Sequence, residues 1–325
     1  MLFMCVIILV IGFAALIKGA DLFVDGSAAL AKNFNVPGLI IGLTIVAVGT
    51  SAPELAVSTT AALQKANEIA LSNVVGSNIF NLLGVLGICA IIYPVSAQKE
   101  VLKRDFPVSI VAAMLVFFVT SGKFIFSGAV LSADMKSGAG NVSRITGGFL
   151  IAFFIIYIIY LIADAKKHPA QETDAKKQPV WKCILLIAAG LLLIVGGGQC
   201  VVYGAKEIAK TLGMTETLIG LTIVAIGTSL PELVTSVVAA RKGETGLAVG
   251  NVIGSNIFNL LFILGISALI HPVAVNAASV YDMGILILAS VLALLFLTSG
   301  KTLRRLEGVM MVLLYIADVV FAVIR

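Results

Sequence analysis

Two acidic residues stand inside long apolar stretches of the chain. Glu54 ends the segment Gly-Thr-Ser-Ala-Pro-Glu, and Glu232 ends Gly-Thr-Ser-Leu-Pro-Glu at a constant offset of 178 residues. A charged side chain at mid-bilayer costs roughly 2.5 to 3.5 kcal/mol on insertion scales, so an acid there normally faces a cavity, a partner or an ion. The duplicated carboxylate therefore predicts a functional site rather than a chance polar residue.

The residues before each glutamate predict a local break in the helix. Pro53 and Pro231 lack a backbone N–H and clash with the preceding turn, while Gly49 and Gly227 permit unusual dihedrals. Unwinding bares backbone carbonyls, which are tolerated at membrane depth only where protein, water or an ion satisfies them. Carbonyl oxygens beside a carboxylate are hard ligands, so the two segments predict a cation site.

Hydroxyl and amide side chains surround each acid. Those within the first motif are Thr50 and Ser51, matched by Thr228 and Ser229. A following motif places Asn73, Ser77 and Asn81 on one helix face, matched by Asn251, Ser255 and Asn259.

Each of these side chains has an ordinary structural alternative. Hydroxyls often bond back to the preceding turn, and Asn or Ser can join helices for about 0.6 to 2 kcal/mol each. The duplication favours a ligand role for the hydroxyls and for Ser77, Asn81, Ser255 and Asn259. The roles of Asn73, Asn78, Asn251 and Asn256 stay open.

Composition identifies the class of protein. The chain has 325 residues, of which 60% are hydrophobic and 12% charged, with a mean hydropathy of +1.11. These values indicate an integral membrane protein of the all-α class, embedded in a lipid bilayer, with room for about ten spanning helices. The net charge of +5 does not indicate nucleic acid, because the basic residues are scattered over short loops. We read the first apolar run as a spanning helix rather than a signal peptide.

The apolar segments divide the chain into two halves. In the first half we expect spans over 2–32, 37–64, 68–93, 107–120 and 144–163, with Phe124 to Leu131 in a loop. The charged segment 164–182 is the expected linker, and the second half, 183–325, begins with a span over 190–210. Residues 41–95 and 219–273 share about 34 identities in about 55 positions, which indicates an internal repeat. The two units expected are thus 1–163, with motifs at 49–54 and 73–81, and 183–325, with motifs at 227–232 and 251–259.

Five helices per half is an odd number, so the second half must enter the membrane from the opposite side. The positive-inside rule then places the Lys-rich linker in the cytoplasm and both termini outside. Of the 22 Lys and Arg residues, 14 fall inside and 7 outside, with Lys18 within a helix. We further expect Lys18, Asp21 and Asp25 to pair within the first helix, and Asp318 to make a packing contact.

Inverted repeats bring the two breaks together at the midplane, so Glu54 and Glu232 should face one another. Two carboxylates in a low dielectric repel unless a cation lies between them, and one Ca²⁺ or two Na⁺ balances their charge. Transition metals are less suited, because His168 lies in the linker and His271 in a loop.

The paired pattern Gly-Thr-Ser-x-Pro-Glu and Gly-Ser-Asn-x-x-Asn resembles the two alpha repeats of the calcium/cation antiporter superfamily. The chain is most similar to its prokaryotic sodium/calcium exchangers, over essentially its whole length. The resemblance implies ten helices in two inverted five-helix repeats, broken at the midplane. It also implies Ca²⁺ extrusion driven by Na⁺ influx, with no cofactor and no obligatory protein partner.

The resemblance also implies the ligands. The residues matching the family's Ca²⁺ ligands are Glu54, Glu232 and the backbone carbonyls of Thr50 and Thr228. The residues matching its Na⁺ sites are Ala47, Ser51 and Ser255 on one side and Ala225, Ser229 and Ser77 on the other. We add Asn81 and Asn259 to the Na⁺ set from their own spacing.

Two departures bear on the subtype. The proton-coupled branch carries Asn after the motif glycine, whereas Thr50 and Thr228 stand there in this chain and favour Na⁺. The potassium-dependent branch, and some sodium exchangers of similar length, carry Asp at the position of Asn259. With only two formal negatives, the site suits one Ca²⁺ or two Na⁺ better than three Na⁺.

We therefore expect exchange by alternating access, with the long first and sixth helices as sliding gate elements. A potassium-dependent or proton-coupled exchanger is the nearest alternative, and a cation channel is a different class that would pass uncoupled current. An intramembrane enzyme is disfavoured, because no His or nucleophile accompanies the motif.

Overall fold

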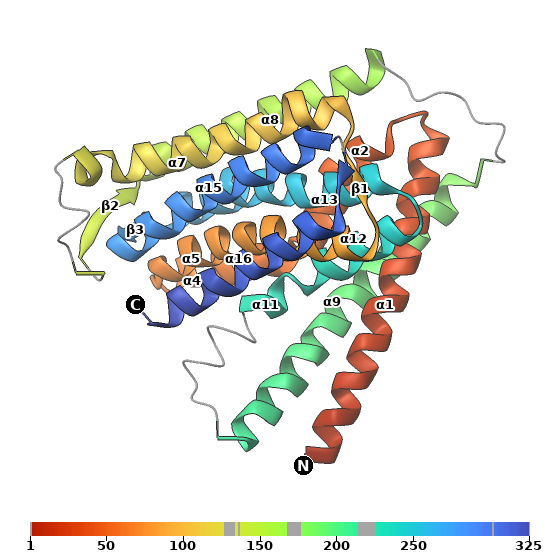
Figure 1. Ribbon diagram of the computed structural model, residues 1–325, viewed down its shortest axis with the longest axis horizontal. Coiled ribbons are helices and arrows are strands. Elements are labelled where there is room, and N and C mark those ends of the chain that lie inside the picture. The colour runs from red at the N-terminus through yellow and green to blue at the C-terminus, as the bar shows by residue number, and fades with distance from the viewer. Residues whose placement is uncertain are drawn as a thin grey trace.

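The structure is a computed structural model and describes residues 2–126, 134–135, 137–167, 177–213, 225–300 and 302–324. Helices make up most of these residues, and the remaining regular structure consists of short strands (Figure 1). This confirms the predicted all-α class.

The first half runs from a long N-terminal helix to the central linker. Its elements are α1 (Leu2–Asn33), α2 (Gly38–Ile41), η1 (Gly42–Val46), α3 (Ala47–Thr50), α4 (Ala52–Leu63), α5 (Asn67–Ile79), η2 (Phe80–Val85), α6 (Leu86–Ile92), β1 (Val95–Ser96), η3 (Val101–Asp105), α7 (Phe106–Phe126), β2 (Gly138–Val142) and α8 (Arg144–Lys167), where η denotes a π-helical segment.

The second half follows a similar order. Its elements are α9 (Val180–Thr211), α11 (Ala225–Thr228), α12 (Leu230–Arg241), α13 (Thr245–Ile257), η6 (Phe258–Ile263), α14 (Leu264–Ile270), β3 (Val273–Asn276), α15 (Ala277–Gly300), β4 (Thr302–Leu303) and α16 (Arg305–Ile324).

Eight described helices are long and apolar enough to cross a membrane, and up to nine if the bent pair 38–50 and 52–63 forms one span. The seventh predicted span, which carries the second motif, includes 214–224, and these residues lie outside the described ones. The fourth helix was predicted too short: α7 continues to Phe126, past the expected end at Thr120. The sixth was predicted to begin at Gly190 but begins at Val180, because the residues before Gly190 are apolar apart from Lys182 and continue the helix.

The motif helices break where the sequence predicts. α3 ends at Thr50 and α4 begins at Ala52, with a bend of 49° between the two parts. Ser51 has φ −81° and ψ 10°, and Ser229 repeats this with φ −94° and ψ 9°. The break is thus limited to one serine in each motif, because proline resumes helical geometry in the first turn of the next helix.

The helices that carry the second motif form the centre of the molecule. In the spans 69–92 and 245–270, 78% of the most apolar window is buried, against 22% for α1 and 11% for α16. Both central helices change to π-helix after the motif isoleucine, at Phe80 and at Phe258. Such bulges are frequent at functional sites, and here they contain Asn81 and Asn259.

α1 and α9 lie side by side and extend away from the other helices (Figure 1). They pack antiparallel through glycines: a methyl group added at Gly12 would come within 2.9 Å of the Gly197 carbonyl oxygen, and one at Gly19 within 2.8 Å of that of Gly190. Backbones this close leave no space for a side chain, so the two helices form one tightly joined pair.

The short strands pair residues of the two halves. β1 pairs antiparallel with β4, and β2 with β3. A loop of the first half is thereby hydrogen-bonded to a loop of the second at two places. These contacts join the halves outside the helical core.

Candidate cation site

Glu54 and Glu232 occupy matching places in the fold. Each lies in the first turn of the helix that follows the break, α4 or α12, and each side chain is fully buried. The N-terminus of a helix carries a partial positive charge and favours a carboxylate. Proline at the start of each helix fixes this position, so the motif places an acid where the helix itself helps to stabilise it.

The two carboxylates are held by each other's motif. Ser229 Oγ donates a hydrogen bond to Glu54 Oε1 at 2.7 Å, and Ser51 Oγ donates one to Glu232 Oε1 at 2.8 Å. Residues of the two motifs, 175 and 181 positions apart, are therefore neighbours, as the sequence predicts. Each carboxylate thus accepts a bond from the serine three residues before the other glutamate, which places the two acids near each other.

The remaining oxygens of the site have no hydrogen-bond partner among the described residues. These buried atoms are Glu54 Oε2, Glu232 Oε2, Asn81 Oδ1 and Asn259 Oδ1. Leaving a buried acceptor unsatisfied costs about 1 to 3 kcal/mol, and more when the group is charged. A hard cation that bound these four oxygens as ligands would satisfy them.

Ser77 and Ser255 connect the central helices to the motif helices. Ser77 Oγ donates to Glu54 Oε1 at 3.5 Å, and Ser255 Oγ donates to the Ala47 carbonyl at 3.5 Å. The Ala47 carbonyl also accepts from the Ser51 N–H at 3.0 Å and from Thr50 Oγ1 at 3.3 Å. Ala47 therefore lies beside the site, as expected.

Thr50 makes the ordinary structural bond considered for it and also a contact with the other half. Its hydroxyl bonds back to the Val46 carbonyl at 3.1 Å and also contacts Asn251 Oδ1 at 3.0 Å. Thr228 ends α11 at the matching place. Ala225 begins α11, and its side chain lies outside the described residues.

Asn73 and Asn251 support the glutamate helices. Asn73 Nδ2 donates to Ser58 Oγ at 2.9 Å and to the Glu54 carbonyl at 3.3 Å. Asn251 Nδ2 makes the matching bonds to Ser236 Oγ at 2.9 Å and to the Glu232 carbonyl at 3.4 Å. The sequence analysis missed Ser58 and Ser236, although their offset of 178 residues was a usable signal.

Asn78 and Asn256 bond across the centre. Asn78 Nδ2 donates to the Asn256 carbonyl at 3.1 Å, and Asn256 Nδ2 donates to the Asn78 carbonyl at 3.3 Å. Asn81 Nδ2 donates to Asn256 Oδ1 at 3.2 Å, and Asn259 Nδ2 donates to Asn78 Oδ1 at 3.0 Å. All four side chains are fully buried.

The oxygens of this site are ligands of the kind that hard cations prefer. Every polar side-chain contact named above uses oxygen or amide groups, and among the described residues no three His, Cys, Asp or Glu side chains gather into a metal-binding group. Carboxylate, amide and carbonyl oxygens suit Ca²⁺ and Na⁺ better than transition metals.

Charged residues outside the site differ from expectation. Asp21 and Asp25 were predicted to pair with Lys18 within α1, but they pair with Lys242, which follows α12. Lys242 Nζ lies 2.7 Å from Asp25 Oδ1 and 3.2 Å from Asp21 Oδ1. Tertiary packing of α1 against α12 brings these groups together, which spacing within one helix does not reveal.

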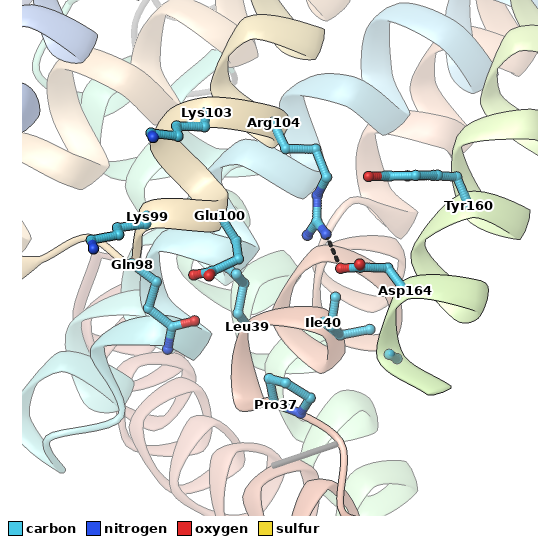
Figure 2. A pocket seen from close by; sticks show the side chains of 11 residues that line it. Pro37, Leu39, Ile40, Gln98, Lys99, Glu100, Lys103, Arg104, Tyr160 and Asp164 are labelled. Carbon is cyan, nitrogen blue, oxygen red and sulfur yellow. Dashed lines mark hydrogen bonds and ion pairs between the residues drawn. The ribbon is translucent and has the colours of Figure 1, made fainter. Parts of the chain in front are cut away.

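A second charged cluster joins η3 to α8. Arg104 Nε and Nη2 bind the two oxygens of Asp105 at 2.7 and 3.0 Å, and the Tyr157 hydroxyl donates to Asp105 Oδ1 at 2.9 Å. Figure 2 shows Arg104 reaching Asp164 beside the ring of Tyr160. A cavity of about 580 Å³ adjoins this cluster. The cluster fixes α8 to the start of α7, and the sequence analysis missed it.

Comparison with known proteins agrees with this description. The family model for "Sodium/calcium exchanger protein" matches residues 4–163 and 182–324. The chain is 33% identical over 339 residues to the sodium/calcium exchanger MaX1 of Methanosarcina acetivorans, covering 97% of each chain. It is 33% identical over 298 residues to the inner membrane protein YrbG of Escherichia coli, covering 88% of this chain and 86% of that protein.

Solved structures of the sodium-calcium exchanger NCX_Mj are similar in fold. One, soaked with Na⁺ and Ca²⁺, superposes with a TM-score of 0.82 at 32% identity, covering 98% of this chain and 99% of that one. The apolar helices and this fold define a multi-pass membrane protein of the transporter class. More particularly, the chain belongs to the sodium/calcium exchanger protein family.

Proposed function

We propose that this protein is a secondary active antiporter that exchanges Ca²⁺ for Na⁺ across the cell membrane by alternating access. The observation that carries the proposal is the set of four buried oxygens without hydrogen-bond partners among the described residues, on Glu54, Glu232, Asn81 and Asn259. Membership of a family whose relatives include proteins named sodium/calcium exchangers supports the choice of ions.

The proposed Ca²⁺ ligands are the carboxylates of Glu54 and Glu232 and the backbone carbonyls of Thr50 and Thr228. The proposed Na⁺ ligands are Ala47, Ser51, Ser77, Asn81, Ala225, Ser229, Ser255 and Asn259. The reciprocal serine bonds support this division, because each serine already touches the carboxylate of the other motif. A Na⁺ bound beside a serine would therefore lie next to that carboxylate.

Exchange follows from the electrostatics of the empty site. Two buried carboxylates repel strongly in a low dielectric, so a site without cations is costly to move between the two membrane faces. Binding of one Ca²⁺ or two Na⁺ removes that repulsion, so the site can then move between the two membrane faces. The joined pair α1 and α9 is the proposed moving element, and its glycine packing supports motion as one body.

The proposed topology has ten helices in two inverted five-helix repeats, 1–163 and 183–325, with the linker 164–182 in the cytoplasm and both termini outside. The strand pairs support it, because each joins one loop of each half. A protease site added at the N-terminus should be cut from outside intact cells. Cleavage only after lysis would contradict this orientation.

Tracer flux tests the proposed function. Purified protein in liposomes loaded with Na⁺ should take up ⁴⁵Ca²⁺ when the outside lacks Na⁺, and uptake should stop when the Na⁺ gradient is removed. Supplying a K⁺ or a pH gradient alone distinguishes potassium-dependent and proton-coupled exchange. Uptake driven by either gradient without Na⁺, or conductive current without coupling, would contradict the proposal.

A further inference from the structure

The four central asparagines form a chain of hydrogen bonds that ends on the site. The side chains of Asn78 and Asn256 each donate to the backbone carbonyl of the other residue. Asn78 Oδ1 then accepts from Asn259, and Asn256 Oδ1 accepts from Asn81. We propose that Asn78 and Asn256 are positioning residues, each of which sets the orientation of the ligand amide on the opposite central helix. This inference rests on the proposed cation site.

The backbone fixes the direction of the chain of bonds. The Asn78 carbonyl oxygen can only accept a hydrogen bond, so the side chain of Asn256 must present its Nδ2 group to it, at 3.3 Å. Asn256 Oδ1 then faces Asn81 and accepts from Asn81 Nδ2 at 3.2 Å. Because Asn81 Nδ2 is used in this bond, Asn81 Oδ1 is the end of the amide that remains for a cation.

The same sequence of bonds runs in the opposite direction. The Asn256 carbonyl accepts from Asn78 Nδ2 at 3.1 Å, so Asn78 Oδ1 faces Asn259 and accepts from Asn259 Nδ2 at 3.0 Å. Asn259 Oδ1 is left buried and without a partner among the described residues, like Asn81 Oδ1. Two backbone carbonyls thus determine that both ligand amides offer an oxygen and not an N–H group.

This orientation matters for a cation. An amide that turns by half a rotation presents N–H dipoles, which repel a positive ion that the oxygen would attract. Without Asn78, the amide of Asn259 loses the acceptor that holds its nitrogen away from the site. The same holds for Asn256 and Asn81. The two dependencies are crossed, because each positioning residue acts on the opposite helix.

The crossed pattern predicts which double substitutions combine. Asn78→Ala and Asn259→Ala should each weaken Na⁺ binding about tenfold, and the double variant should be no worse than Asn259→Ala alone. Asn256→Ala and Asn81→Ala should behave in the same way. The matched controls are the same-helix pairs Asn78→Ala with Asn81→Ala and Asn256→Ala with Asn259→Ala, in which the fold-changes should multiply.

Displacement of bound ⁴⁵Ca²⁺ from purified protein by Na⁺ measures these Na⁺ affinities without requiring transport. The half-saturating Na⁺ concentration and the maximal rate of uptake are then compared, and the half-saturating concentration should change more. Independent effects within the crossed pairs, or equal coupling in crossed and same-helix pairs, would overturn the inference. So would a lowered thermal midpoint with unchanged Na⁺ affinity, since that indicates packing alone.

If the alanine variants do not purify as folded protein, Asn78→Ser and Asn256→Ser take their place, because a buried serine can bond to its own helix. The same titrations and the same pairings apply to them. Failure of the proposed function has a different signature. In that case Na⁺ binding by the variants keeps the crossed coupling, but the unsubstituted protein shows no Na⁺-driven uptake.

Discussion

The centre of the molecule and the outer ends of its motif helices differ in how closely the two halves match. At the centre, the bond from Ser229 to Glu54 has a counterpart from Ser51 to Glu232, with lengths of 2.7 and 2.8 Å. At the outer end, Lys242 pairs with Asp25, whereas the position matching Lys242 by the offset of 178 residues is Gln64.

The difference extends to the partner helices. The residues on α9 that match Asp21 and Asp25 of α1 are Gln199 and Tyr203. The charged contact between α1 and α12 therefore has no charged counterpart in these matching positions. The two halves match at the residues proposed to bind a cation and differ at the ends of the motif helices. We infer that ion chemistry depends on the mirrored centre, while the ends set the relative stability of conformations.

The largest expected effect comes from removing either carboxylate. Glu54→Gln and Glu232→Gln should each abolish Na⁺-driven ⁴⁵Ca²⁺ uptake in liposomes, because a single remaining charge cannot balance Ca²⁺ in a buried site. If the centre is truly mirrored, the two losses should be equal. Normal exchange in either variant would refute the site, and near-normal activity in only one would refute the mirrored arrangement.

Removing either motif serine should have a smaller effect. Ser51→Ala and Ser229→Ala each delete a hydrogen bond to a carboxylate, which contributes about 1.5 to 3 kcal/mol. We expect the half-saturating Na⁺ concentration to rise about tenfold, by similar factors in the two variants. Ser290→Ala is the control, since Ser290 Oγ bonds within its own helix to the Leu286 carbonyl at 2.7 Å. An equally large rise in the half-saturating Na⁺ concentration of Ser290→Ala would contradict a specific role for the two motif serines.

The pair α1 and α9 allows a comparison of adjacent glycines. Gly197→Ala places a methyl group 2.8 Å from the Gly12 carbonyl oxygen, whereas nothing lies within 4 Å of such a group at Gly196. Gly197→Ala should lower the free energy of unfolding by about 1 to 3 kcal/mol, while Gly196→Ala should be neutral or stabilising. Thermal unfolding in detergent measures both. Equal midpoints for the two variants would contradict the close packing.

The smallest effect is expected from replacing Lys242, which directly follows α12. Lys242→Gln makes this end resemble its match at Gln64 and removes ion pairs whose side chains are 30 to 58% exposed. Exposed pairs contribute about 0.2 to 1 kcal/mol and are screened by salt. The apparent Ca²⁺ affinity on one membrane face should therefore shift less than tenfold, and the shift should shrink in high salt. A complete loss of transport would show that this pair belongs to the site.

The sequence predicts the centre well because the repeat marks it. The broken motif helices, the burial of both glutamates and the nearness of Ser51 and Ser229 to them are found as expected. The repeat works as an internal alignment, since a polar residue that recurs inside two apolar helices at a fixed offset has a shared physical cause.

What the sequence does not reveal depends on tertiary contacts. The bond from Asn81 to Asn256 joins helices of different halves, and no local pattern shows which asparagine meets which. The π-helical segments at Phe80 and Phe258 were likewise not predicted. The bond from Arg104 to Asp164 and the pairing of Lys242 with Asp25 were missed for the same reason, because these partners are distant in the sequence.

The central claim is that the four buried oxygens of Glu54, Glu232, Asn81 and Asn259 hold a cation between the two halves. Crystals of the protein soaked with Ca²⁺ or Sr²⁺ test this most directly through anomalous scattering. We predict a peak about 2.3 to 2.6 Å from Glu54 Oε2 and Glu232 Oε2 for Ca²⁺. A cation found only elsewhere, or none at saturating concentration, would contradict the account.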